Sequence, residues 1–556
     1  MGWQTLCDQA EENPTTIGGS MDKLEEEYVR FEPDTFLPTN LQEVEVVKIM
    51  HFDPNGHFEE PVDLFQREDG STSSVLKEEY RHMFEHSASS SFFAERHSDK
   101  KPFTMHELMS FFGNLFYMEV TVKGESANHW GRQAEDSIFG ASGVNLENIM
   151  PLKRFKHLRQ ALSFRSEVSV ETLQRDPAAR IRCLLNLLKI TGGKYIDLGR
   201  DVALDEASVA CRPRYGRHLS VYNPRKPTGK YHFNIYMMCC ASTWVAVNFR
   251  LYCAGDITDR LHTVTSESEA QALRDELKEV ATVRQHVLEV VRPIYGSQRV
   301  VNTDNFYTSV QLLQALRLKG LRGRGTVRTN SKHSPKHVML HGKESVRGDY
   351  RHGVSVEQQM LAASWCDVNI VRVVSNADAS ILSTVQRRVG ADTIQCTGPL
   401  CVKNYNAYMQ GVDRLDQTRA RFSIADGHSF QKWHKKLAMA LIDIARCNAY
   451  LTRKLVLPTE TCRDPHRDFE LDLINDLLSG KWAEAPSSAQ MLYTTNALDL
   501  SALAAPSPVS PAKCSWEQTA SDANASSVAG KTETPLKFQI FALSTQYVFA
   551  RTYMAK

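Results

Sequence analysis

The sequence lacks an excess of charge of either sign and lacks an uninterrupted apolar run of membrane-spanning length. Its 556 residues include 66 Lys and Arg and 65 Asp and Glu, for a net charge of +1. Because proteins that bind a polyanion usually carry a basic excess, any case for nucleic acid must come from local patches. The longest apolar stretch, 233–249, is interrupted by Asn234, Ser242, Thr243 and Asn248. This pattern predicts two strands joined by a Ser-Thr turn and no membrane partner.

The chain also lacks a cysteine framework. Its 12 cysteines are scattered and mostly lie in apolar runs, such as the one that ends at Cys239 and Cys240. Such cysteines are typical of reduced core thiols in an intracellular compartment. After residue 455 only Cys462, His466 and Cys514 have side chains of the Cys and His types. The four-ligand spacing of a zinc module is missing, so no structural zinc is expected.

The composition, 42% hydrophobic and 24% charged, is that of a folded chain with two to four structural units. We expect a flexible region over 1–58 and a mainly helical unit over 59–195, with helical patterns over 61–84 and 104–118. Thr104 and Glu107 have the spacing of a capping box. Basic residues within 153–165 suggest DNA contact or dimerisation for this unit, and a solvated charged face is the simpler alternative.

A strand-rich core follows the helical unit. Apolar runs predict strands over 202–205, 231–240 and 244–253, a helix over 267–291, a strand over 299–303, a helix over 307–318 and a strand over 325–328. The order is mixed α/β, and we divide it into a first core part at 196–330, a β-rich insertion at 331–380 and a second core part at 381–456 with terminal helices. The Ser-, Ala- and Pro-biased segment 457–556 reads as a largely disordered tail.

Carboxylates occur where this core could bring them together. Asp205 ends one predicted strand and Asp304 ends another, while Asp413 and Asp416 share a face of a predicted helix. A bare buried cluster of carboxylates would be strongly repulsive, and two Mg²⁺ ions would remove that repulsion and support phosphodiester displacement. Each acid taken singly could equally be a turn former or a helix cap.

Several short motifs resemble the piggyBac transposase family in type and in order. They are Leu204-Asp205-Glu206, Asn223 to Pro227 with Gly229 and Lys230, Asp304 to Ser309, Gly325 to Arg328, Trp365 with Asp367, and Tyr408 to Gln417. The resemblance covers about 60–455, and within the family the chain looks closest to the domesticated chordate branch. It implies an RNase H-like core with a β-rich insertion, preceded by a helical domain and followed by a helical segment and a disordered tail.

The resemblance also implies a site. Asp205, Asp304 and Asp413 would be catalytic ligands of two Mg²⁺ or Mn²⁺ ions, with Asp416 as a fourth catalytic acid. Glu206 points to the opposite face of its strand and is expected to be structural. The chain departs from the family pattern in the Cys211 to Arg217 segment and in its missing Cys-rich module, which puts recognition of specific DNA ends in doubt.

Two basic segments, 212–230 and 317–336, are expected to lie near the carboxylates. The residues we assign to DNA backbone contacts are Arg225, Lys226, Lys230, Arg328 and Lys332. Arg322 and Arg324 belong to the same segments, and solvated turns are the alternative for both.

Together these patterns predict a DNA transposase or a domesticated derivative that cleaves and transfers DNA strands with metal ions. Its partners would be double-stranded DNA and a second copy of itself, with no small-molecule substrate, and it would act in the nucleus. A catalytically silent DNA- or chromatin-binding protein and a structure-selective nuclease are the alternatives.

Overall fold

The computed structural model describes residues 50–77, 103–131, 144–164, 168–193, 195–211, 219–223, 230–252, 282–328, 334–342, 345–389, 392–455 and 463–480, with single positions at 138, 216, 268 and 331. Most of the flexible region expected over 1–58 and most of the helix expected over 267–291 lie outside these ranges. All statements below concern the described residues.

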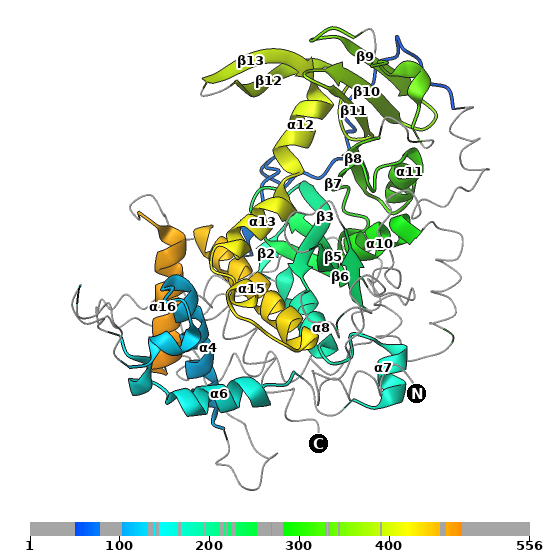
Figure 1. Ribbon diagram of the computed structural model, residues 1–556. Helices are drawn as coiled ribbons and strands as arrows, with labels where there is room; N and C mark the ends of the chain where they lie inside the picture. The colour runs from blue at the N-terminus through cyan, green and yellow to red at the C-terminus, as the bar shows by residue number, and fades with distance from the viewer. Residues whose placement is uncertain are drawn as a thin grey trace, which may run out of the picture.

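A nine-stranded sheet forms the centre of the molecule (Figure 1). Its strands are β3 (Asp201–Ala210), β4 (Ser220–Tyr222), β5 (Tyr231–Cys240), β6 (Ala246–Leu251), β7 (Val300–Thr303), β8 (Arg322–Thr326), β9 (Tyr350–Ser355), β10 (Met360–Cys366) and β11 (Ile370–Ser375). They lie in the order β4-β5-β3-β7-β8-β11-β10-β9, and β6 pairs with β5. β7 runs parallel to β3 and to β8, whereas β5 is antiparallel to β3.

The apolar runs of the sequence explain the central strands. β5 is buried along nearly its whole length, as expected for a strand covered on both faces. β5 and β6 are separated by the turn at 241–245, which confirms the two strands predicted from the interrupted run at 233–249. Three antiparallel strands followed by two parallel strands, each reached through a helix, is the order of an RNase H-like core, and the mixed α/β prediction is confirmed.

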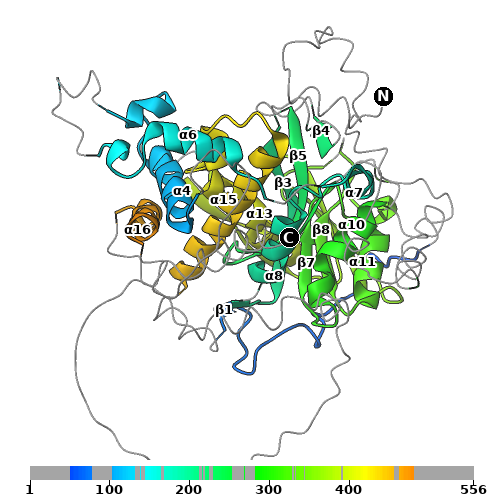
Figure 2. The same cartoon turned by 90° about the horizontal axis from the view of Figure 1, so that it is seen from below.

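Helices cover both faces of the sheet, so the core has three layers (Figure 2). α13 (Gly411–Ala420) packs on β3 and β5, and α15 (Trp433–Lys454) lies behind it. On the other face, α10 (Thr282–Val291) packs on β5 and β6, while α11 (Val310–Leu318) packs on β8. The apolar side chains between these layers form one large hydrophobic cluster.

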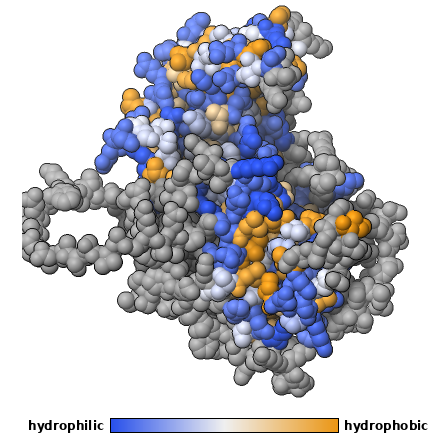
Figure 3. All heavy atoms as spheres, turned by 90° about the vertical axis from the view of Figure 1, so that its left-hand side faces the viewer, coloured by the Kyte–Doolittle hydropathy of each residue, from blue (hydrophilic) through white to orange (hydrophobic). Residues whose placement is uncertain are grey.

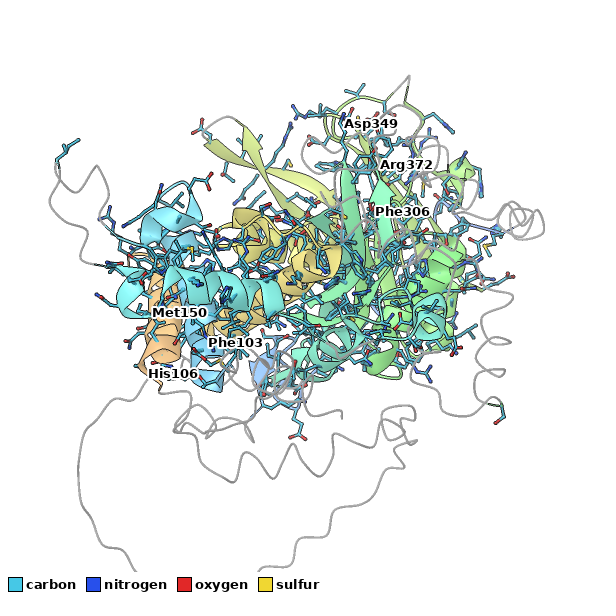
Figure 4. The ribbon with its side chains drawn as sticks, turned by 60° about the horizontal axis from the view of Figure 1, so that its bottom comes forward. Phe103, His106, Met150, Phe306, Asp349 and Arg372 are labelled. Atoms are coloured by element: carbon cyan, nitrogen blue, oxygen red, sulfur yellow. The ribbon has the colours of Figure 1, made fainter. Side chains whose placement is uncertain are left out.

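A helical unit lies beside the sheet. Its helices are α4 (Met105–Val120), η2 (Ser126–His129), η3 (Leu146–Asn148) and α6 (Leu152–Ala161), with α4 packed on α6. α7 (Val170–Arg175) follows, and α8 (Arg182–Gly192) packs on β6 and α15 of the core. The predicted capping box is present at the start of α4, where the Thr104 side chain accepts from the Glu107 amide and the Glu107 carboxylate accepts from the Thr104 amide. Figure 4 shows Phe103, His106 and Met150 together in this unit.

Two expectations do not hold here. The helical pattern at 61–84 is wrong for the described part, because 61–74 consists of turns and loop and β1 (Val75–Leu76) pairs with β2 (Ile196–Asp197). A largely disordered tail from 457 does not describe 463–480, where α16 (Pro465–Ser479) is an ordered helix. α16 buries Phe469, Leu473 and Leu477 and packs on α4, which supplies the apolar partner that sequence alone could not show.

The segment expected as a β-rich insertion contains strands that continue the central sheet. β11 pairs with β8 in antiparallel fashion, and β10 and β9 follow it to the sheet edge. A hairpin of β12 (Leu382–Val389) and β13 (Asp392–Pro399) then leads into α12 (Leu400–Tyr408). The remaining short helices are η6 (Arg292–Ile294), η7 (Lys336–Val338) and α14 (Ile424–Gly427).

The cysteines in the described ranges carry free thiols and are mostly buried, as expected for core residues. Among the helices that the structure describes, none combines the length and apolarity needed to cross a membrane. Figure 3 shows the face at the left of Figure 1, where hydrophilic side chains gather across the middle.

Candidate functional site

Two of the predicted acids lie side by side in the sheet. Leu204 pairs with Thr303 where β3 and β7 run parallel, so the next residues, Asp205 and Asp304, are neighbours. Asp304 directly follows β7 as predicted, whereas the strand end predicted at Asp205 is wrong, because β3 continues to Ala210 in its pairing with β5. The turn after β7 holds Asp304 in place, because the amide of Phe306 donates to Asp304 Oδ1 at 2.8 Å. Figure 4 places Phe306 in the sheet half of the molecule, away from the helical unit.

Burial and neighbouring charges shift the pKa of both acids. Burial raises the pKa of Asp205 well above its usual range, and the charges of Glu206 and Asp304 raise it further. Burial also raises the pKa of Asp304; backbone hydrogen bonds and the charge of Arg328 act in the opposite direction, while Asp413 adds repulsion. Two buried carboxylates beside each other disfavour the state in which both are ionised.

Asp413, in the first turn of α13, is the third acid, and its charge acts on Asp304. α12 ends at Tyr408 and α13 begins at Gly411, so the single predicted helix over this segment is two helices. Gly411 permits a close approach, since a Cβ at this position would lie 3.0 Å from the Ala203 Cβ and 3.2 Å from the Cys240 carbonyl oxygen. The helix therefore lies directly against β3, which carries Asp205, and against its neighbour β5.

Asp416 is held by contacts with its own helix and with β3. Arg419 Nε donates to Asp416 Oδ1 at 3.2 Å, and the amide of Ser208 lies 3.4 Å from Asp416 Oδ2. Arg419 also donates to the Ser208 carbonyl at 3.0 Å. The three residues fasten α13 to β3. The catalytic role assigned to Asp416 stays a prediction, and the contacts show a positioning role.

Three residues that the sequence reasoning did not single out as members of the site surround the acids. Tyr405, on α12, has its pKa raised to about 12 by burial, and the charges of Asp304, Asp205 and Asp413 add to that shift. Its hydroxyl accepts from Thr326 Oγ1 at 3.2 Å. No sequence signal marks Tyr405, because its place depends on how α12 crosses the sheet.

Tyr236 and Tyr307 occupy the environment of Glu206. Glu206 lies opposite Tyr236 in the β3–β5 pairing. Burial raises the pKa of both tyrosines, and the charge of Glu206 contributes in the same direction. Glu206 thus has aromatic hydroxyls as neighbours, and its role stays a prediction. Tyr307 lies inside the sequence motif that begins at Asp304, and this was the one feature of the sequence that could have indicated its place near the site.

The donor chemistry of the acids suits a hard divalent cation. Asp205, Asp304 and Asp413 offer only carboxylate oxygens, the ligands that Mg²⁺ prefers. Burial raises the pKa of Asp205 and of Asp304, and the carboxylates repel one another in addition; a bound cation would favour their ionised forms. Within the described ranges, however, no group of three or more His, Cys, Asp or Glu side chains is arranged to hold a metal ion. The charges of these carboxylates act on one another, but in the described residues their oxygen atoms are not arranged as a set of metal ligands.

The predicted DNA contacts are distributed unevenly around these acids. Arg328 is beside the site, with its guanidinium Nε 3.2 Å from Asn305 Oδ1 and 5.8 Å between its Cζ and the Phe306 ring. Lys230 is exposed at the start of β5, seven residues before Met237, which pairs with Asp205. At the rise of a strand this corresponds to roughly 23 Å. The other three, Arg225, Lys226 and Lys332, lie outside the described residues.

Arg322 and Arg324 do not face a DNA surface, which corrects the expectation for their segment. Arg322 donates to the Asp63 carboxylate at 2.5 and 2.7 Å. Arg324 is only 1% exposed and bonds to Asp378 and Asp201. Alternation along β8 turns both side chains inward, where carboxylates from distant segments neutralise them.

Comparisons with known proteins agree with this arrangement. A family profile described as Transposase IS4 matches residues 73–450. The human protein PiggyBac transposable element-derived protein 2 is 28% identical over 169 residues, which are 30% of this chain and 27% of that protein. The chain thus matches about a quarter of the length of this curated relative.

A solved structure shares the fold. It is described as a cryo-EM structure of piggyBac transposase synaptic complex with hairpin DNA, and it matches with a TM-score of 0.54 and 21% identity over 75% of this chain and 80% of the other. Because the family profile spans well over half of the sequence, the chain belongs to the Transposase IS4 family, and the piggyBac-like character predicted from its motifs is confirmed.

Proposed function

We propose that this protein is a piggyBac-like DNA transposase, or a domesticated derivative of one, that cleaves and transfers DNA strands at Asp205, Asp304 and Asp413. The observation that carries the proposal is that Asp205, within β3, and Asp304, directly after β7, follow the matched pair Leu204 and Thr303 on adjacent parallel strands, with repulsion from Asp413 reaching Asp304. Double-stranded DNA would be the substrate, and a homodimer in the nucleus the acting form.

Asp205, Asp304 and Asp413 would hold two Mg²⁺ or Mn²⁺ ions. Bound there, the ions would supply an activated oxygen nucleophile and stabilise the leaving oxygen of an in-line displacement at phosphorus. The chain's own groups orient the reaction. The turn at Phe306 fixes the Asp304 carboxylate, while Asp416 and Arg419 fix α13. Arg328, next to Asp304, is placed to contact a DNA phosphate.

A strand-cleavage assay tests the proposal. Supercoiled plasmid and hairpin-ended duplex DNA are incubated with Mg²⁺ or Mn²⁺ and with the wild type, Asp205→Asn, Asp304→Asn or Asp413→Asn. Asp392→Asn is the matched control, because it removes an exposed carboxylate on the β12–β13 hairpin. We expect each site variant to lose more than about a hundredfold in rate, since even the outer partners of metal ligands cost ten- to a hundredfold.

The outcomes separate the candidate functions. Equal activity in the wild type and the site variants would contradict the assignment of these acids. No cleavage by any folded protein, with DNA binding retained, would favour the catalytically silent DNA-binding protein. The absence of a three-ligand group in the described ranges is the observation that favours this second candidate. Cleavage without joined ends would indicate a structure-selective nuclease.

A further inference from the structure

A pocket with a volume of about 280 Å³ lies beside α13, apart from the acids. Four segments form it: the β5–β6 turn with Trp244, α13 and its C-cap with Arg414 and Arg421, the end of α15 with Tyr450 and Lys454, and the start of α16 with His466. Ligand sites in proteins begin at about 300 Å³, so the space suits one small group or one unit of a polymer.

The pocket and the proposed active site share one helix. Arg414, Gln417, Thr418 and Arg421 stand at positions i, i+3, i+4 and i+7, so they form a single stripe along α13. Asp413 directly precedes this stripe and lies on the neighbouring face. A strand whose phosphate reaches Asp413 would therefore pass the mouth of the pocket within a few residues of the same helix.

Trp244 is held in an unusual backbone conformation. Its φ is +66°, in the left-handed region, which non-glycine residues enter at a cost of about 1–3 kcal/mol. The amide of Trp244 donates to the Cys240 carbonyl at 3.0 Å and closes the turn. Glycine or asparagine would satisfy this backbone with less strain, so the turn itself does not explain the large indole ring. Strain of this kind clusters at ligand sites.

Two cations flank that ring without a carboxylate partner. The Arg414 guanidinium carbon lies 5.9 Å and the Lys454 ammonium 5.6 Å from the centre of the Trp244 ring. Within the described ranges neither cation forms an ion pair, whereas Arg421 is bound by Asp464. The pocket thus offers two uncompensated positive charges next to an aromatic face.

The ligand chemistry follows from this combination. Uncompensated cations favour a phosphate or carboxylate, and an indole ring favours a flat aromatic group. An acidic peptide supplies only the first of these groups. A nucleotide supplies both, and a single nucleotide is comparable in size to the pocket. Paired bases inside a duplex are stacked and cannot enter, so the nucleotide must be unpaired.

We propose that this pocket binds one unpaired nucleotide of a DNA strand, with its phosphate between Arg414 and Lys454 and its base on Trp244. The inference rests on the proposed function, because that function supplies the strand at α13. It extends that function by giving the protein a contact for distorted or single-stranded DNA beside the site of cleavage.

The test is binding of fluorescein-labelled oligo(dT) and of a blunt duplex to the full-length protein, measured by anisotropy over a range of salt concentrations. Lys454→Gln removes the exposed cation, and Trp244→Asn removes the ring while keeping a residue that tolerates positive φ. Lys319→Gln is the matched control, since its ammonium likewise lies 5.6 Å from an aromatic ring, that of Tyr295. That pair is at the end of α11, beyond the opposite face of the sheet.

We expect Trp244→Asn to weaken oligo(dT) binding about tenfold, the loss of one base stack. Lys454→Gln should lower the slope of log Kd against log salt by about 0.7, the contribution of one phosphate on a single strand. Duplex affinity should change little, and Lys319→Gln should behave as the wild type. If Trp244→Asn lowers the thermal stability, the exposed Lys454→Gln carries the test alone.

Other results would overturn the inference. Unchanged oligo(dT) affinity and salt slope in Lys454→Gln would exclude phosphate binding at the pocket. Free dTMP that competes as strongly as the oligonucleotide would identify a free-nucleotide site, and a phosphopeptide that binds more tightly would identify a protein partner. These readouts do not depend on cleavage. Nucleotide binding at the pocket can therefore be disproved even if Asp205, Asp304 and Asp413 prove catalytic, and it can be confirmed even if they do not.

Discussion

The buried Arg324 network provides a sharp test of what holds the core together. Arg324 Nε and one terminal nitrogen bond to the Asp378 carboxylate at 2.6 and 2.7 Å, and the other terminal nitrogen bonds to Asp201 at 2.9 Å and to Asn302 at 2.8 Å. Both Arg324 and Asp378 are 1% exposed. These bonds connect β8 with the start of β3, with β7 and with the segment after β11.

We expect Arg324→Met to be strongly destabilising. The substitution keeps an unbranched side chain but leaves Asp378 buried without its cation, while Asp201 keeps its ion pair with Arg200. Removing one partner of a buried ion pair costs about 3–5 kcal/mol, a large part of the roughly 5–15 kcal/mol that holds a domain folded. The charge of Arg324 lowers the pKa of Asp378 against the effect of burial, so the variant should also raise that pKa.

Urea unfolding followed by circular dichroism measures the effect. Arg347→Met is the matched control, because Arg347 is 54% exposed and pairs with Asp367 at 3.0 Å on the surface. A surface pair of this kind contributes about 0–1 kcal/mol. Adding Asp378→Asn to Arg324→Met should recover about 1–3 kcal/mol, because the stranded charge is then gone. A loss for Arg324→Met no greater than for Arg347→Met would refute the reasoning.

Three further predictions follow from the site and from the helical unit. Asp205→Asn should raise the melting temperature in the absence of metal while abolishing cleavage, since it removes a repulsive buried charge; a lower melting temperature in calorimetry would contradict this. Burial raises the pKa of Glu119 from 4.5 to about 7, so the folded state holds a proton that the unfolded state releases. The urea midpoint should therefore fall as the pH rises from about 4.5 to 7, and Glu119→Gln should flatten that dependence. Gly427→Ala should cost about 1–3 kcal/mol, because its Cβ would lie 2.0 Å from both Glu119 carboxylate oxygens, and pairing it with Glu119→Ala should restore part of the loss in the same measurement.

The sequence predicts those elements whose signal is local. The helix with the capping box at Thr104 and the two strands around Ser242 follow from residues close together in the chain. α16 and β1 could not be predicted in this way, because each is stabilised by a partner far away in sequence. α16 is covered by α4, and β1 exists only through its pairing with Ile196 and Asp197.

The same distinction applies to charged residues. The strand end before Asp304 could be predicted, because an acid directly after an apolar run often marks the end of a strand. The same pattern was misleading at Asp205, where β3 continues to Ala210 through its pairing with β5. Arg324 looks like a DNA-binding residue when only its neighbours in the chain are considered. Its partners Asp201 and Asp378 are 123 and 54 residues away, so only the sheet register shows that its charge is already neutralised inside the core.

α13 connects the two halves of the proposed chemistry. One of its faces carries Asp413 towards Asp304, and the adjacent face carries Arg414 into the basic pocket. Asp416 and Arg419 fasten the helix to β3, so the acid and the pocket keep a fixed relation to the sheet and to each other. A DNA strand positioned by Trp244 and Lys454 would thereby be positioned relative to Asp205 and Asp304 as well. Loss of the Asp416 contact would disturb both sites together, whereas loss of Lys454 would disturb only the pocket.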